Sequence, residues 1–147
     1  MSVIPYIPVY VPNQFVGNND TLLVIWGPTT AQYNGLTAAQ LAALAAATPL
    51  TYTTLDSGSP IQLPAWADCS IQVVGTFGAG GNVVIEGSND GINYGTLNDP
   101  YGVSLNMTNN TPRQITERCQ FLRPRVIGGD GTTSLTVLGL FRRQPLS

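Results

Sequence analysis

The 147-residue sequence contains no histidine and no lysine. Without histidine there is no imidazole to act as general base in a Ser-His-Asp or Cys-His site. Without lysine there is no amine for Schiff-base chemistry and no P-loop lysine. A standard zinc site is also excluded, because Cys69 and Cys119 are the only two cysteines. Paired carboxylates are the one catalytic option that the residue types leave open. We therefore expect a protein that is not an enzyme and has no cofactor and no metal site.

Charge is scarce and unevenly distributed. Charged residues make up 10% of the chain, against about 25% in a typical globular domain. Residues 1–112 carry six acids and no base, a charge of −6, whereas residues 113–147 carry six arginines and two acids, a charge of +4. This asymmetry is typical of self-complementary assembly, of an acidic partner or of pairing within the chain. The exclusive use of arginine favours buried or interfacial pairs, and the net charge of −2 argues against a nucleic-acid partner.

Long apolar runs and the basic first residues of a standard secretory signal are missing as well. No apolar run approaches the ~18 residues that span a membrane, and the first residues carry no basic group, so we expect no membrane partner. Two cysteines are too few for a disulfide scaffold. We expect Cys69 and Cys119 to be reduced thiols buried in strands, and a disulfide between them stays open if those strands are neighbours.

The first twenty residues are rich in proline and apolar side chains. Three prolines lie within the first twelve residues, and no charge occurs before Asp20. Proline fixes φ and disfavours helix, which predicts an extended N-terminal arm over residues 1–20. Such an apolar strip should be covered, either by its own domain or, as we favour, by a neighbouring subunit. The arm residues that we expect in this contact are Tyr6, Tyr10 and Phe15.

Residues 21–147 are expected to form one mainly β domain. Short alternating runs are separated by turn residues at intervals of about 8–12 residues, a pattern typical of an antiparallel β-sandwich, which we expect to be jelly-roll-like. Pro124 should mark a strand edge or a bulge. The expected strands are 21–26, 51–55, 69–77, 82–87, 92–97, 103–107, 113–117, 119–127 and 133–142.

One helix is expected near residues 37–47, which read TAAQLAALAAA. Thr37 is a suitable N-cap, alanine and leucine are strong helix formers, and Pro49 prevents the helix from continuing. We expect it to be a connector that packs on a sheet or on a neighbour.

Two segments carry a resemblance to a known class of proteins. Residues 83–105 contain the hairpin sequence EGSNDG, and residues 119–143 contain Arg-Pro in a strand, a Gly-rich turn and a last Thr/Leu strand that ends in arginine. Together they resemble tailed-bacteriophage capsid decoration (cement) proteins and related small virion structural proteins. The resemblance implies a homodimer or homotrimer, made in the host cytoplasm, that binds the outer capsid surface of the virion and stabilises contacts between major capsid protein subunits. At the C-terminal end, the residues that we expect in contacts are Arg142 and Arg143.

Two alternatives remain open. A tail, neck or head-fibre component would have the same composition and differ only in its location. The Ser-Asn-Asp-Gly turn at residues 88–91 also resembles discoidin-like carbohydrate-binding modules, which would require an exposed aromatic ring near Tyr94 or Tyr101.

Overall fold

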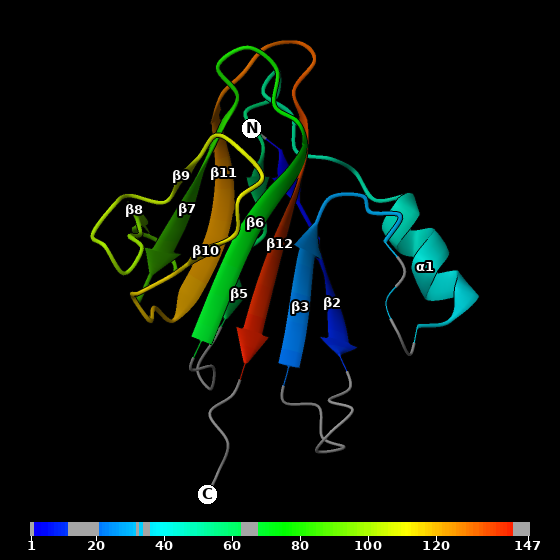
Figure 1. The fold of residues 1–147 in the computed structure, drawn as a ribbon, viewed down its shortest axis with the longest axis horizontal. Coiled ribbons are helices and arrows are strands. Elements are labelled where there is room, and N and C mark those ends of the chain that lie inside the picture. Colours follow the sequence, from blue (N-terminus) through cyan, green and yellow to red (C-terminus); the bar gives the residue numbers. More distant parts are fainter. Residues whose placement is uncertain (1, 12–20, 32, 34–35, 63–67, 143–147) are drawn as a thin grey trace, which may run out of the picture.

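The computed structural model describes residues 2–11, 21–31, 33, 36–62 and 68–142. These residues form a mainly β fold in which two sheets face each other, with one short helix, as the sequence predicts (Figure 1). Sheet A runs in the order β1-β4-β11-β7-β8, with β5 paired to β11 and β9 paired to β7. Its strands are β1 (Val3–Ile4), β4 (Ser57–Gly58), β5 (Ile61–Gln62), β7 (Asn82–Ser88), β8 (Gly95–Thr96), β9 (Asn106–Met107) and β11 (Phe121–Gly128).

Sheet B is fully antiparallel and runs in the order β10-β6-β12-β3-β2. Its strands are β2 (Tyr6–Val11), β3 (Thr21–Trp26), β6 (Asp68–Thr76), β10 (Arg113–Gln114) and β12 (Ser134–Arg142). Alternate residues of the long strands fill the space between the sheets, as the two-residue period of a strand requires. Trp26, the largest side chain of this core, is fully buried, packs edge-on against Tyr6 and donates its indole N–H to the carbonyl of Ser59 at 2.9 Å.

The N-terminal segment is part of the sandwich rather than a separate arm. Val3 and Ile4 pair with β4 in sheet A, and residues 6–11 pair with β3 in sheet B. The chain therefore crosses between the sheets at Pro5, and Ile4 is buried in the core. The expected extended conformation is found over residues 3–11, where the strands pair with β4 and β3 of their own domain. Residues 12–20 lie outside the described residues.

Two prolines occupy strand positions where a missing N–H breaks no ladder. The N–H of Tyr6 donates to Ser59 Oγ and therefore points away from β3. The backbone nitrogen of Pro8, two residues later, faces the same way, so proline only removes a donor from the free edge of β2. Pro124 lies in a strand paired on both sides, so the expectation of an edge or a bulge at Pro124 is wrong. The N–H of Val126 points to the β4 side of β11. The backbone nitrogen of Pro124, two residues earlier, faces the same side at the gap between β4 and β5, so its missing N–H breaks no ladder hydrogen bond.

Helix α1 (Ala38–Ala45) is shorter than the expected 37–47 but is capped as expected. The side chains of Thr37 and Gln40 each accept from the other residue's backbone N–H, which is a complete capping box. Leu44 is the one described helix residue that is buried, and it packs on Val9, Leu23 and Ile25. Leu44 therefore packs the helix against the outer face of sheet B at its β2–β3 side, and Figure 1 shows α1 beside β2.

Several expected strands are short or absent. Residues 51–55 form a turn instead of a strand, because the buried carboxylate of Asp56 accepts hydrogen bonds from the Thr51 N–H and from the hydroxyls of Thr51 and Thr54. The expected strands at 92–97, 103–107 and 113–117 are reduced to the two-residue strands β8, β9 and β10. Within the described part of the chain, the search for a helix long and apolar enough to cross a membrane found none.

Candidate interaction surface

A hairpin at the margin of sheet A is held by one carboxylate. Residues 97–105, here called the edge hairpin, project beside β8 (Figure 1). Asp99 Oδ1 accepts hydrogen bonds from the N–H groups of Tyr101 and Val103, at 2.9 and 3.0 Å. Asp99 Oδ2 accepts from Arg113 Nη2 at 2.8 Å. The bond from Arg113, followed by that from Val103, holds the pKa of Asp99 below its usual range. The carboxylate is therefore charged and fixes the turn at neutral pH.

Arg113 and Glu117 anchor the edge hairpin to the rest of the domain. Besides Asp99, Arg113 Nη2 donates to the carbonyls of Val103 and Ser104, at 3.4 and 3.2 Å. Glu117 accepts from the backbone N–H and from the side-chain amide of Asn98, at 2.9 and 2.8 Å. These hydrogen bonds tie the hairpin to β10 and to the segment that follows it. At the apex of the hairpin, Tyr101 is 92% exposed and Val103 is 55% exposed.

The turn between β7 and β8 is built in the same way. Asp90 Oδ1 accepts from the N–H groups of Ile92 and Asn93, both at 2.8 Å, and from the hydroxyl of Ser88. The N–H of Asn93, then that of Ile92, lowers the pKa of Asp90. Ile92 is 81% exposed.

Both turns follow one rule. In each turn, an aspartate side chain accepts a hydrogen bond from the N–H of the residue two positions later. That residue has a large apolar side chain exposed to solvent. We call Ile92, Tyr101 and Val103 the apolar tips. A rigid exposed apolar group loses little conformational entropy on binding, so such tips are suited to insertion into a partner.

An open hollow adjoins the edge hairpin through Arg113. It measures about 370 Å³ and is lined by polar side chains that include Asn106, Asn109 and Thr111, together with Met107. Amide and guanidinium groups of this kind can form hydrogen bonds with the hydroxyl groups of a sugar.

No family model, curated protein or solved structure matches the chain. Its function therefore has to be argued from geometry.

A second charged cluster lies on the outer face of sheet A. Arg123 stands directly opposite Glu86 across β11 and β7, and Arg125 is two residues further along β11. Their Nε groups both donate to Glu86 Oε1, at 3.2 and 3.1 Å. The guanidinium of Arg123 also lies 3.8 Å from the centre of the Tyr94 ring, so this ring face is occupied. We call Arg123 and Arg125 the arginine pair.

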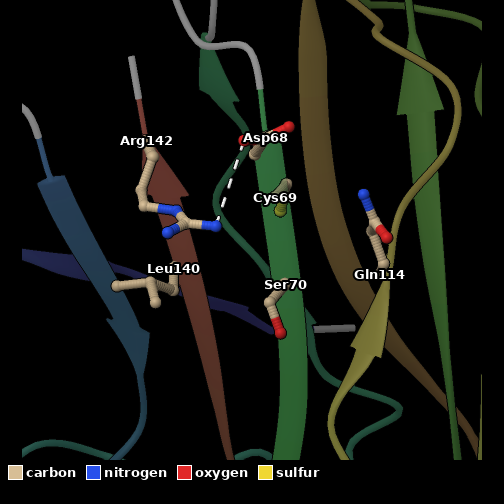
Figure 2. Close-up of a pocket in the computed structure, with 6 residues that line it drawn as sticks. All are labelled: Asp68, Cys69, Ser70, Gln114, Leu140 and Arg142. Carbon is tan, nitrogen blue, oxygen red and sulfur yellow. Dashed lines mark ion pairs between the residues drawn. The ribbon is translucent and has the colours of Figure 1, made fainter. Parts of the chain in front are cut away.

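The residues that the sequence analysis selected are not brought together. Tyr6 is half-buried against Trp26 and belongs to the core. Phe15, Arg143 and the side chain of Tyr10 lie outside the described residues. Arg142 is exposed and lies 4.0 Å from Asp68, an ion pair between side chains that are 63% and 53% exposed (Figure 2). Of the five, Arg142 is thus the one described side chain that is free to meet a partner.

Arg142 lines a hollow of about 290 Å³ with Cys69, Ser70, Gln114, Leu140 and Asp68 (Figure 2). Burial raises the pKa of the Cys69 thiol far above neutrality, so the thiol is protonated and unsuited to nucleophilic attack. Burial, followed by the charge of Glu117, also raises the pKa of Cys119. Both cysteines are free thiols, half-buried rather than fully buried. Across the described ranges, no three histidine, cysteine or acidic residues gather as metal ligands would.

Sequence reasoning named Tyr101 only for the carbohydrate alternative, and it missed Ile92 and Arg113. A signal for the tips is present in Asp-Gly-Ile and Asp-Pro-Tyr, where a turn-forming aspartate precedes an apolar residue by two positions. No comparable local signal marks Arg113. Its partner Asp99 lies in the edge hairpin, fourteen residues away in the sequence.

Proposed function

We propose that the chain is a non-enzymatic virion structural protein of a tailed bacteriophage. In this proposal it is a decoration protein that docks on the outer capsid surface and stabilises contacts between major capsid protein subunits. The observation that carries the proposal is the pair of carboxylate-locked turns that hold the apolar tips in solvent. Solvent-facing Tyr and Ile side chains on fixed turns favour protein binding, since aromatic anchors supply much of the energy of interfaces.

The low charge of the chain supports the same role. Charge depletion is characteristic of interface centres, and only 10% of the residues of this chain are charged. A contact of only a few side chains is weak by itself. On a symmetric shell, a homodimer or homotrimer would engage several subunits at once and gain affinity through multivalency.

The experiment is co-sedimentation of the purified protein with shells of the same virus that lack it. The wild-type protein should pellet with the shells, and the double variant Ile92→Ser/Tyr101→Ser should remain in the supernatant. Leu55→Ser is the matched control, because Leu55 is 50% exposed but lies outside the two turns. Absence of wild-type binding to capsids would refute the proposal. Binding to tails or fibres instead would assign the protein to those structures.

A carbohydrate-binding module is the second candidate. It is favoured by the exposed Tyr101 ring of the edge hairpin and by the polar hollow of Asn106 and Asn109, whereas Tyr94 is covered by Arg123. Tyr101→Leu separates the two functions. An apolar protein pocket accepts leucine with a modest loss, while a sugar ring needs the flat π face and would lose its platform. Specific binding on a glycan array that this substitution abolishes would establish the carbohydrate function.

A further inference from the structure

The arginine pair carries a positive charge that the described part of the domain does not neutralise. Two guanidinium groups share the single carboxylate of Glu86, and both bonds go from Nε to the same oxygen. Arg123 has one further contact, its stacking on Tyr94. None of the four Nη nitrogens of the pair donates a hydrogen bond to a described residue. One positive charge and the two outer edges of the guanidinium groups are therefore available.

The pair is held in position before any ligand arrives. Both arginines project from β11, a strand that is paired on both of its sides. Glu86, whose side chain is only 6% exposed, fixes the inner edges, and the Tyr94 ring supports Arg123 from one face. The Tyr94 hydroxyl is itself buried without a hydrogen-bond partner among the described residues. A fixed guanidinium fork binds an anion without first losing side-chain freedom.

The neighbouring residues favour a protein surface as the source of that anion. Along the same outward face of β11, Phe121 precedes the pair and Ile127, which is 39% exposed, follows it. An aromatic residue, two arginines and an aliphatic residue in a row are the composition enriched at interface centres. A polyanion such as nucleic acid is disfavoured, because the cluster has a surplus of one charge and the chain as a whole is acidic.

We propose that the arginine pair binds an aspartate or glutamate side chain of the major capsid subunit on which the protein docks. The outer edges of Arg123 and Arg125 donate charge-assisted hydrogen bonds to this carboxylate, while Glu86 holds their inner edges. This inference rests on the proposed function and adds to it the chemistry of one contact.

Arg125→Met tests the inference, because methionine keeps an unbranched apolar chain and Glu86 retains Arg123. Arg118→Met is the matched control, since Arg118 is exposed and makes no ion pair with a described residue. Shell co-sedimentation is measured between about 50 and 300 mM NaCl, a range over which screening of exposed charges changes strongly. We expect Arg125→Met to weaken shell binding roughly tenfold or more and to flatten its salt dependence, while Arg118→Met stays within roughly twofold of wild type. Arg125→Lys should recover the salt dependence but only part of the affinity, because it restores the charge without the fork.

The outcomes separate the two proposals. If the wild-type protein does not bind shells, the proposed function fails. If it binds and Arg125→Met binds equally well with the same salt dependence, the function stands and the carboxylate inference is overturned. Loss of self-association by Arg125→Met, with unchanged shell binding, overturns it too, because the anion would then belong to a second copy of the chain.

Discussion

Removing both members of the arginine pair should destabilise the domain more than the two single changes together. In Arg125→Met, Glu86 keeps Arg123, so the expected loss is about 0.5 kcal/mol, as for a partly exposed ion pair. Arg123→Met also loses the stacking on Tyr94, which brings its loss to about 1 kcal/mol. In the double variant, a carboxylate on a side chain that is 6% exposed is left without a cation. Stranding a buried charge costs about 3–5 kcal/mol, and partial access of water favours the lower end.

The double variant should therefore lose about 3–4 kcal/mol, an excess of about 2 kcal/mol over the two single changes. Urea unfolding of the four proteins measures this excess, provided that their denaturant slopes agree. An excess below about 0.5 kcal/mol would mean that the changes are additive. That result would refute the reasoning that Glu86 depends on either arginine.

Three further results are expected. The carboxyl pKa values of Asp90, Asp99 and Asp130 lie below the ordinary value of 3.8. The stability that these carboxylates contribute is therefore complete above that pH and is lost as the pH falls through the pKa values of the folded protein. The melting temperature should drop on acidification below about pH 4, and it should drop less steeply in Asp99→Asn. Gly58→Ala would place a methyl group 2.5 Å from Trp26 Cδ1 and 2.6 Å from Pro124 Cδ. The free energy of unfolding, measured in urea, should therefore fall by at least about 1–3 kcal/mol. Gly95→Ala is the control and should show no clash penalty, because nothing lies within 4 Å of the added methyl group. The Cys69 thiol should react with iodoacetamide more slowly in the folded protein at neutral pH than in urea, because desolvation raises its pKa, and equal rates would contradict this.

The sequence predicted those elements whose signals are local. β3 has the expected bounds, because an apolar run ended by Gly27 and Pro28 defines it without help from the rest of the chain. The Thr37 capping box is equally local, since Thr37 and Gln40 satisfy each other. The errors arise where a distant or competing partner decides. Residues 51–55 have strand-like composition, but the buried Asp56 carboxylate competes for their hydrogen bonds and folds them into a turn.

The N-terminal segment illustrates the same limit. Its prolines correctly predict an extended chain. Composition alone, however, does not distinguish an edge strand of the chain's own sheet from an arm that binds a neighbouring subunit. The place of this segment in its own sheets depends on contacts with distant residues, such as the hydrogen bond that Ser59 accepts from the N–H of Tyr6, 53 residues away. Deletion of residues 1–16 would therefore remove β1 from sheet A and β2 from sheet B, and should destabilise the fold itself. Point changes at the apolar tips are the better test of docking.

The charge asymmetry along the chain is largely explained by pairing between distant strands. Every arginine of the ion pairs that the structure gives lies after residue 112, and every acid of these pairs lies before it: Arg113 with Asp99, Arg123 and Arg125 with Glu86, and Arg142 with Asp68. Of the three origins that the sequence left open, pairing within the chain therefore accounts for most of the split. The 2:1 stoichiometry at Glu86 is the exception, since one carboxylate serves two guanidinium groups in a half-buried setting. A sheet face that only had to be stable would match its charges or omit them, because surplus charge in such a place is costly. The surplus at the arginine pair is thus the feature that calls for an external anion.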